Sequence, residues 1–219
     1  MSFPLDDVLR ALHRSPRIMI LANPNNPTGT TVAPTVLRKL IPAFPRTLFV
    51  VDEAYHEFSR ITVLPWIRRY PNLAVVRTFS KAAGLAGLRF GCIAASAEVT
   101  RLLSRTLDTF PVNVAAMAAV QAALRDQKSI WRYAAQIARS RKVVSQVLAG
   151  MGIRMFPSTA NFVLADFGPQ APHVVRALAR QGIFLRDRAA DFGRPGFVRI
   201  TLGTMPQMKR LIRALKALL

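Results

Sequence analysis

The sequence predicts an α/β fold, with a mostly parallel sheet and helices followed by a small α+β domain. Over residues 1–130, short apolar runs alternate with longer stretches of helical periodicity, which is the pattern of repeated strand–helix–strand units. Over residues 131–219, one long helical pattern precedes several short strand-like runs. Of the 219 residues, 51% are hydrophobic and 19% charged, a composition that can bury a core and is too apolar for a disordered chain.

Each predicted strand of the first domain is a short apolar run that ends in polar or turn-forming residues. The first predicted helix begins at Pro34, where proline suits the first helical position, and it places Leu37 and Leu40 on one face. Strands are predicted at 17–22, 47–51, 73–77 and 90–95, and further helices at 97–106 and 113–124.

The second domain begins with a long helix after Lys128, which Gly150 and Gly152 are expected to end. A closing amphipathic helix puts Met208 and Leu211 on its apolar face. Strands are predicted at 153–156, 161–166, 183–186 and 197–202, around a helix near 173–180.

Composition also narrows the possible partners. The formal net charge is +20, but the basic residues are scattered and no nucleic-acid-binding motif accompanies them, so we favour solvated basic faces over nucleic-acid binding. The longest apolar stretch, 110–124, is too short to span a membrane, and no signal peptide is evident, so we expect a cytoplasmic protein without a membrane partner. Cys92 is the one cysteine, which excludes a disulfide framework, and we expect it to be buried in its strand. The histidines lack metal-ligand spacing, so no metal site is predicted.

Polar clusters follow the first three predicted strands. They are Asn23–Gly29, Asp52–Tyr55 and Thr78–Lys81, the last continuing into the glycine-containing stretch Gly84–Gly91. Because ligands bind beyond the carboxyl ends of parallel strands, we expect these clusters to serve one ligand.

Lysine and aspartate at neighbouring strand ends indicate a particular chemistry. Lys81 could be desolvated there and act as a Schiff-base amine. Asp52 could keep a pyridine nitrogen protonated, which turns that ring into an electron sink.

The remaining polar residues supply complementary groups. Ser80 and Arg89 could bind a phosphate, the arginine through paired charge-assisted hydrogen bonds. Asn26 and Tyr55 could bind a phenolate oxygen. Together these requirements describe pyridoxal phosphate.

Five motifs carry a resemblance to a known family. They are NPNNPTGT at 23–30, DEAYHEF at 52–58, TFSKAAGLAGLRFG at 78–91, FLRD at 184–187 and FVRITLGT at 197–204. In this order and spacing they resemble the class I/II aminotransferases of fold type I, which depend on pyridoxal phosphate, and within them the histidinol-phosphate aminotransferase branch. The resemblance implies a residual cofactor-binding large domain over 1–130 and a small C-terminal domain over 131–219.

The resemblance also implies roles for these residues. Lys81 would form the Schiff base and then move the proton between the substrate Cα and the cofactor, while Asp52 would pair with the pyridine nitrogen. Asn26 and Tyr55 would contact the ring oxygen. The cofactor phosphate would be bound by Ser80 and Arg89.

For the substrate, Arg199 would hold the carboxylate or, in the histidinol-phosphate branch, the phosphate. Arg186 would assist it, although pairing with Asp187 or Asp191 is a structural alternative for Arg186. The substrates would be a small-molecule amino donor, either an amino acid or histidinol phosphate, and a 2-oxo acid, 2-oxoglutarate.

Family members carry a longer N-terminal region before the first motif and form homodimers. We therefore expect a chain that lacks part of the family fold, binds its cofactor weakly and has little or no catalytic activity alone. A threonine-phosphate decarboxylase and an aromatic amino-acid aminotransferase are alternative enzymes of the same scaffold. A non-catalytic basic protein that binds nucleic acid or a partner chain is the distant alternative.

Overall fold

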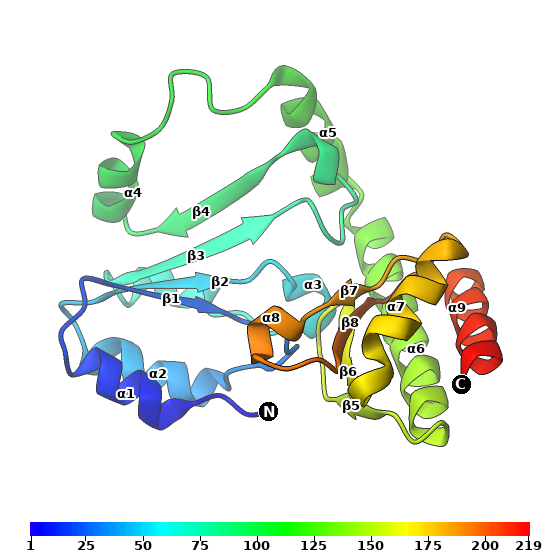
Figure 1. Cartoon of the computed structure of the whole chain (residues 1–219). Helices are drawn as coiled ribbons and strands as arrows, with labels where there is room; N and C mark the ends of the chain where they lie inside the picture. Colours follow the sequence, from blue (N-terminus) through cyan, green and yellow to red (C-terminus); the bar gives the residue numbers. More distant parts are fainter. The chain divides into compact units, whose positions relative to one another are not determined.

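A computed structural model describes residues 1–219, which form two compact units. The larger unit comprises residues 2–25 and 31–131, and the smaller unit comprises residue 1, 26–30 and 132–219. Each unit contains its own four-stranded sheet (Figure 1).

The sheet of the larger unit has the strand order β1-β2-β3-β4. Strands β1 (Ile18–Ala22), β2 (Leu48–Asp52) and β3 (Leu73–Thr78) run parallel, and β4 (Gly91–Ala95) is antiparallel to β3. The four strands expected from the sequence are confirmed to within one residue at each end. Because β1, β2 and β3 are parallel, their C-terminal ends meet at one edge of the sheet.

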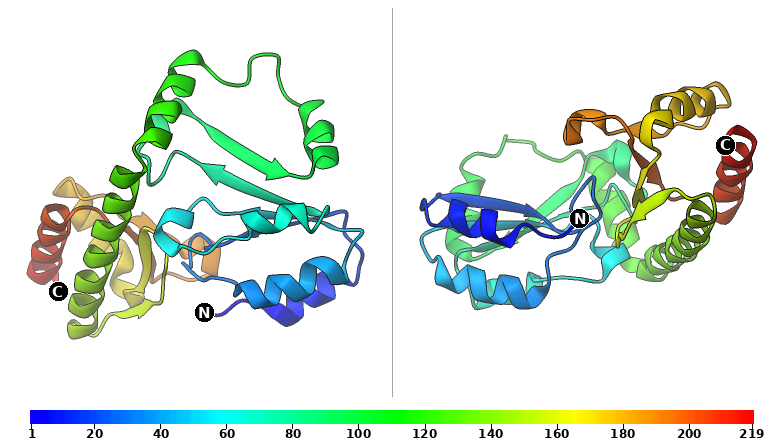
Figure 2. Two further views of the ribbon diagram at one scale, coloured as in Figure 1. Left: turned by 180° about the vertical axis from the view of Figure 1, so that it is seen from behind. Right: turned by 60° about the horizontal axis from the view of Figure 1, so that its bottom comes forward.

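Two helices, α1 (Leu5–Leu12) and α2 (Pro34–Ala43), lie side by side along one face of this sheet (Figures 1 and 2). Helix α2 was expected. Helix α1 was not, although leucines and a valine recur in it with helical spacing. Burying each large aliphatic side chain here contributes about 1.5–3 kcal/mol. The buried core comprises Leu12, Leu37, Leu40 and Ile41 of the helices with Phe49, Val51, Leu73 and Val75 of the strands.

The rest of the larger unit consists of short helices around the sheet. Helix α5 begins where the Asn113 side chain accepts a hydrogen bond from the Ala116 N–H at 2.8 Å, a typical N-cap. The other elements are α3 (His56–Ser59), the 3₁₀ helices η1 (Leu64–Arg68) and η2 (Ala86–Leu88), α4 (Ala97–Ser104) and α5 (Val114–Arg125).

The expectation that Cys92 is buried is wrong. Cys92 is exposed, because β4 forms the edge of the sheet and its first three residues are exposed on both faces. Desolvation of its partly enclosed sulfur nevertheless raises the pKa of the thiol, and the positive charge of Arg77 opposes that effect only in part.

The smaller unit contains an antiparallel sheet of order β5-β6-β8-β7. Helix α6 (Gln127–Gly150) starts in the larger unit and continues into the smaller one. Helices α7 (Ala171–Arg180) and α9 (Met205–Leu218) lie side by side (Figures 1 and 2). The remaining elements are β5 (Arg154–Phe156), β6 (Phe162–Asp166), η3 (Gly168–Gln170), β7 (Arg186–Asp187), α8 (Ala189–Phe192) and β8 (Phe197–Thr201).

One expected strand of the smaller unit is misplaced. The run 183–186 was expected to pair, but β7 is Arg186–Asp187 and pairs only with Arg199 and Val198 of β8. The chain leaves α7 through Gly182, whose φ of +70° is left-handed, and reaches β8 only at Arg186. A prediction from apolar residues alone therefore placed this strand too early in the sequence.

None of the helices combines the length and the apolar composition that a membrane span requires.

Candidate functional site

The carboxylate of Asp52 lies at the C-terminal end of β2. Asp52 is the last residue of the strand, and its register partners are Ala22 of β1 and Val76 of β3. Its Oδ1 accepts a hydrogen bond from the Ala54 N–H at 2.9 Å, while Oδ2 remains available to a cation. The side chain is half-buried. The parallel sheet therefore holds one partly desolvated carboxylate at the edge where its strands end, the edge at which open parallel sheets generally bind ligands.

Lys81 and Tyr55 lie close together in the larger unit. The Lys81 Nζ lies 5.7 Å from the centroid of the buried Tyr55 ring, a cation–π distance. Lys81 itself is half-buried. Two of the residues singled out from the sequence, 26 positions apart, thus form one contact in this unit.

Residues 79–90 form a closed loop that carries Ser80, Lys81 and Arg89. The Phe79 N–H donates to the Phe90 carbonyl at 3.2 Å, and the two rings pack edge to face with centroids 5.4 Å apart. The Ser80 N–H donates to Thr78 Oγ1 at 3.1 Å, which leaves the serine hydroxyl available. The three candidate residues therefore share one constrained segment.

Arg89 has an unusual backbone conformation. Its φ of 55° and ψ of 41° are left-handed, which costs a residue with a side chain about 1–2 kcal/mol. Its guanidinium is exposed and donates to the Ala86 carbonyl at 3.2 Å. Strain of this kind gathers at ligand-binding sites, where surrounding structure maintains it.

A buried ion pair beside these residues was not singled out from the sequence. Glu53 is only 1% exposed, and its carboxylate pairs with the Arg77 guanidinium of β3 at 2.6 Å. Its other partners are Thr62 Oγ1 at 2.8 Å and the Val63 N–H at 2.6 Å. A signal was present in the sequence, because an arginine inside the apolar run of β3 requires a buried partner.

Three further candidate residues belong to the smaller unit. The Arg199 guanidinium donates to the Asn26 side-chain oxygen at 2.7 Å, and it lies 5.3 Å from the centroid of the Phe162 ring. Arg186 is the register partner of Arg199 on the neighbouring strand β7. Opposed residues of an antiparallel pair lie on the same face of the sheet, so this arrangement places two cations side by side.

Arg186 does not form the ion pairs that were its structural alternative. Asp191 pairs with Arg188 at 2.8 Å, and the Asp187 carboxylate accepts the Ala189 N–H at 2.8 Å. The exposed guanidinium of Arg186 is therefore not neutralised by either neighbour.

Within the smaller unit, the segment that carries Asn26 is held closely against residues 158–159. Gly29 has a φ of +75°, and its carbonyl accepts the Thr159 N–H at 3.4 Å. A β-carbon at this position would collide with the Ser158 side chain. Only glycine satisfies both the backbone conformation and the close approach.

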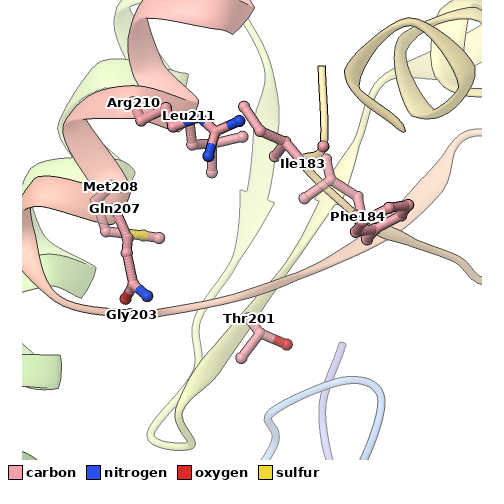
Figure 3. A pocket seen from close by; sticks show the side chains of 10 residues that line it. Ile183, Phe184, Thr201, Gly203, Gln207, Met208, Arg210 and Leu211 are labelled. Carbon is pink, nitrogen blue, oxygen red and sulfur yellow. The ribbon is translucent and has the colours of Figure 1, made fainter. Parts of the chain in front are cut away.

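A pocket of about 300 Å³ also opens in the smaller unit. Figure 3 shows it between the side chains of Phe184, Met208 and Arg210. Its lining includes Leu185 and Thr201, which are close in sequence to Arg186 and Arg199. None of the candidate cofactor-binding or substrate-binding residues lines this pocket.

Comparison with known proteins assigns the family. Residues 2–215 match the family described as aminotransferase class I and II. The chain belongs to this family. The match extends over both units, so the class I and II aminotransferase assignment applies to the whole described chain.

Curated relatives of this chain include histidinol-phosphate aminotransferases. The chain is 40% identical to histidinol-phosphate aminotransferase 2 of Ralstonia nicotianae, with 98% of this chain and 59% of the relative covered. It is 35% identical to histidinol-phosphate aminotransferase 1 of Carboxydothermus hydrogenoformans, with 100% and 62% covered. The chain thus spans about three fifths of the length of these relatives.

Solved structures show the same aminotransferase fold of type I. The histidinol-phosphate aminotransferase of Clostridium acetobutylicum matches 100% of this chain and 68% of its own, with a TM-score of 0.90 and 25% identity. The Sinorhizobium meliloti enzyme, solved in complex with pyridoxal-5'-phosphate, matches 98% and 62%, with a TM-score of 0.81 and 29% identity. The L-threonine-O-3-phosphate decarboxylase of Porphyromonas gingivalis matches 92% and 64%, with a TM-score of 0.80 and 26% identity.

Proposed function

We propose that this aminotransferase-family chain binds pyridoxal phosphate and takes part in amino transfer of the histidinol-phosphate type. The observation that carries the proposal is the contact of Lys81 with Tyr55 in the unit where Asp52 ends β2. A nucleophilic amine, an aromatic hydroxyl and a carboxylate in one unit are the groups that this cofactor requires.

The larger unit fits the cofactor in charge as well as in residue type. The second oxygen of Asp52 is available to a protonated pyridine nitrogen. The Ser80 hydroxyl and the exposed, strained Arg89 suit a phosphate, which favours an arginine with paired donors. The fit supports a ring cation and a phosphate anion bound at opposite ends of one ligand.

When bound, pyridoxal phosphate supplies an electron sink for the electron pair left at the substrate Cα. In the proposal, Asp52 holds the proton on the pyridine nitrogen, and Ser80 and Arg89 bind the phosphate. Tyr55 and Asn26 donate hydrogen bonds to the ring oxygen. The Lys81 ε-amine would accept the proton from the substrate Cα as general base and then, as general acid, donate it to the cofactor.

The substrate end of the proposal rests on the arginines of the smaller unit. Arg199 and Arg186 are opposed on neighbouring strands, and planar guanidinium groups bind carboxylate and phosphate with two hydrogen bonds. Histidinol phosphate as amino donor follows from the names of the relatives, and 2-oxoglutarate as acceptor is what the family resemblance implies. Assembly as a homodimer and a cytoplasmic location belong to the same proposal.

A threonine-phosphate decarboxylase is the second candidate function. The likeness to the Porphyromonas gingivalis decarboxylase favours it, since that protein is named for threonine phosphate, which like histidinol phosphate carries both an amine and a phosphate. An opposed pair of arginines would suit the phosphate of either substrate. The products distinguish the two functions.

The test is titration of the purified 219-residue chain with pyridoxal phosphate, followed by borohydride reduction and peptide mapping. We expect covalent attachment at Lys81, and its loss in Lys81→Ala. Lys142→Ala is the matched control, because Lys142 is an exposed lysine of α6. Attachment spread over surface lysines, with Lys81 no more modified than Lys142, contradicts the proposal.

If Lys81 is modified, the reaction is then identified from its products. Glutamate formation from histidinol phosphate and 2-oxoglutarate supports the aminotransferase. Carbon dioxide release from phosphothreonine supports the decarboxylase instead.

A further inference from the structure

Glu53 is a buried carboxylate immediately after Asp52. It is 1% exposed, and its partners come from two other segments of the larger unit. From β3, Arg77 donates through Nε at 2.8 Å. From the segment after α3, Thr62 Oγ1 donates at 2.8 Å and the Val63 N–H at 2.6 Å. One carboxylate thus joins the end of β2, the segment 62–63 and β3.

The network is closed as well as buried. Arg77 also donates from its second terminal nitrogen to Thr62 Oγ1 at 2.9 Å, so the arginine and the threonine are linked directly. The Glu53 N–H donates to the Val76 carbonyl at 2.9 Å, which ties the backbone of this residue to β3. A buried charge with this many partners is held in one position.

The network borders both groups of candidate cofactor residues. Glu53 directly follows β2, and in the sequence it lies between Asp52 and Tyr55. On β3, Arg77 precedes Thr78, and the Thr78 hydroxyl fixes the backbone N–H of Ser80, the residue before Lys81. The Asp52 carboxylate accepts the Ala54 N–H, whereas the Glu53 carboxylate is bound to Arg77, Thr62 and Val63. Glu53 therefore acts on the site through the backbone segments that it joins.

We infer that Glu53 is a positioning residue, which fixes the carboxylate-bearing end of β2 relative to the lysine-bearing end of β3. This inference rests on the proposed function, in which Asp52 and Lys81 contact the same ligand. Glu53 itself contacts neither ligand nor reacting atoms. Arg77 and Thr62 hold it in place.

Stability alone is a poor explanation of such a pair. A buried ion pair is often no more stabilising than well-packed neutral residues, whereas removal of one partner leaves an unpaired buried charge. Removing both charges should therefore restore stability without restoring the position of the two strand ends. That difference separates a positioning role from a merely structural one.

The experiment compares Glu53→Gln, Arg77→Met and the double variant Glu53→Gln/Arg77→Met. In the double variant the glutamine oxygen can still accept the Val63 N–H, and no buried charge remains unpaired. Three quantities are measured: the melting temperature of the cofactor-free chain, the dissociation constant for pyridoxal phosphate, and the rate of Lys81 acetylation by acetic anhydride relative to Lys142. The matched control is Asp166→Asn, which breaks the Asp166–Arg194 ion pair of the smaller unit.

We expect both single variants to melt at lower temperature and to bind pyridoxal phosphate at least tenfold more weakly. In the double variant the melting temperature should return close to that of the wild type, while the dissociation constant stays at least tenfold raised and Lys81 acetylation stays altered at least twofold. Asp166→Asn should leave the dissociation constant and the acetylation ratio unchanged.

Two results overturn the inference: unchanged cofactor affinity in Glu53→Gln, or recovery of affinity together with melting temperature in the double variant. If the wild type takes up no pyridoxal phosphate, the proposed function fails, and the acetylation ratio of the cofactor-free variants decides alone. A ratio equal to that of the wild type in all three variants then overturns the positioning role, and an altered ratio in the double variant supports it.

Discussion

The two units assemble their charged residues by different geometries. In the larger unit, parallel strands end at one edge. Asp52 is the last residue of its strand, and Tyr55 and Lys81 lie shortly beyond strand ends. In the smaller unit, Arg186 and Arg199 are opposed because two antiparallel strands have a particular register. A parallel sheet gathers residues by where strands stop, whereas an antiparallel sheet gathers them by how strands align.

The charges of the two groups differ as well. The larger unit combines carboxylates with cations, as in the buried pair of Glu53 and Arg77. In the smaller unit, Arg199 donates to the amide oxygen of Asn26 and is opposed by a second cation, Arg186. The first combination suits a cofactor with a cationic ring and an anionic phosphate, and the second suits an anionic substrate.

The largest effect is expected from removing the carboxylate at the end of β2. Asp52→Asn keeps the size of the side chain and the acceptor for the Ala54 N–H, but removes the charge proposed to face the pyridine nitrogen. We expect a loss of about 100- to 1,000-fold in the single-turnover rate of amino transfer, the range for removing one preorganised electrostatic partner. The measurement uses saturating pyridoxal phosphate and histidinol phosphate.

Asp166→Asn is the matched control for this variant. Asp166 likewise ends a strand, and its carboxylate accepts the N–H two residues onward, from Gly168 at 3.0 Å. Its rate should equal that of the wild type. Equal rates in Asp52→Asn and Asp166→Asn would remove the proposed role of Asp52.

Much of the larger unit followed from its sequence, and for a physical reason. Short apolar runs with β-branched residues predict strands, and the order of a parallel sheet makes every strand end a candidate site. Helix α1 was missed even though Leu5, Val8, Leu9 and Leu12 recur with helical spacing. The pattern is only eight residues long, and an isolated helix of that length is marginal without the tertiary packing that Leu12 receives.

The contacts between distant segments could not be predicted in the same way. The sequence gives no register for β7 and β8, so the opposition of Arg186 and Arg199 emerged only from the fold. That Glu53 and Arg77 need charged or polar partners was predictable, since both charges interrupt apolar runs. That Thr62 and Val63 are among those partners was not predictable. The roles assigned to the site residues remain predictions.

An intermediate effect is expected from the arginines of the smaller unit. Arg199→Gln removes charge-assisted hydrogen bonds worth about 1.5–3 kcal/mol, so we expect KM for histidinol phosphate to rise about 10- to 100-fold. Arg199→Lys should recover only part of this loss, because lysine lacks the planar pair of donors. Arg186→Gln should have a smaller effect, since Arg186 is exposed.

Arg210→Gln is the control for these variants, because Arg210 is an exposed arginine of the same unit that lines the pocket of Figure 3. Its KM should remain that of the wild type. Equal increases in Arg199→Gln and Arg210→Gln would indicate a general loss of positive charge and not a specific anion site.

The smallest effect is expected from the Asp166–Arg194 ion pair. Partial burial alone would raise the pKa of Asp166, but hydrogen bonds from the Arg194 side chain and the Gly168 N–H, together with the charges of Arg194 and Arg154, lower it overall. A carboxyl with a lowered pKa stabilises the folded state above its ordinary pKa, and this contribution disappears as the pH falls through the lowered value. Because Arg194 is 54% exposed, solvent screens the pair, and Asp166→Asn should cost about 0.2–1 kcal/mol at neutral pH. Urea unfolding of both proteins from neutral to acidic pH should show the two stabilities converging in acid. A difference that stays constant or grows as the pH falls would mean that the charge of Asp166 is not what stabilises this end of β6.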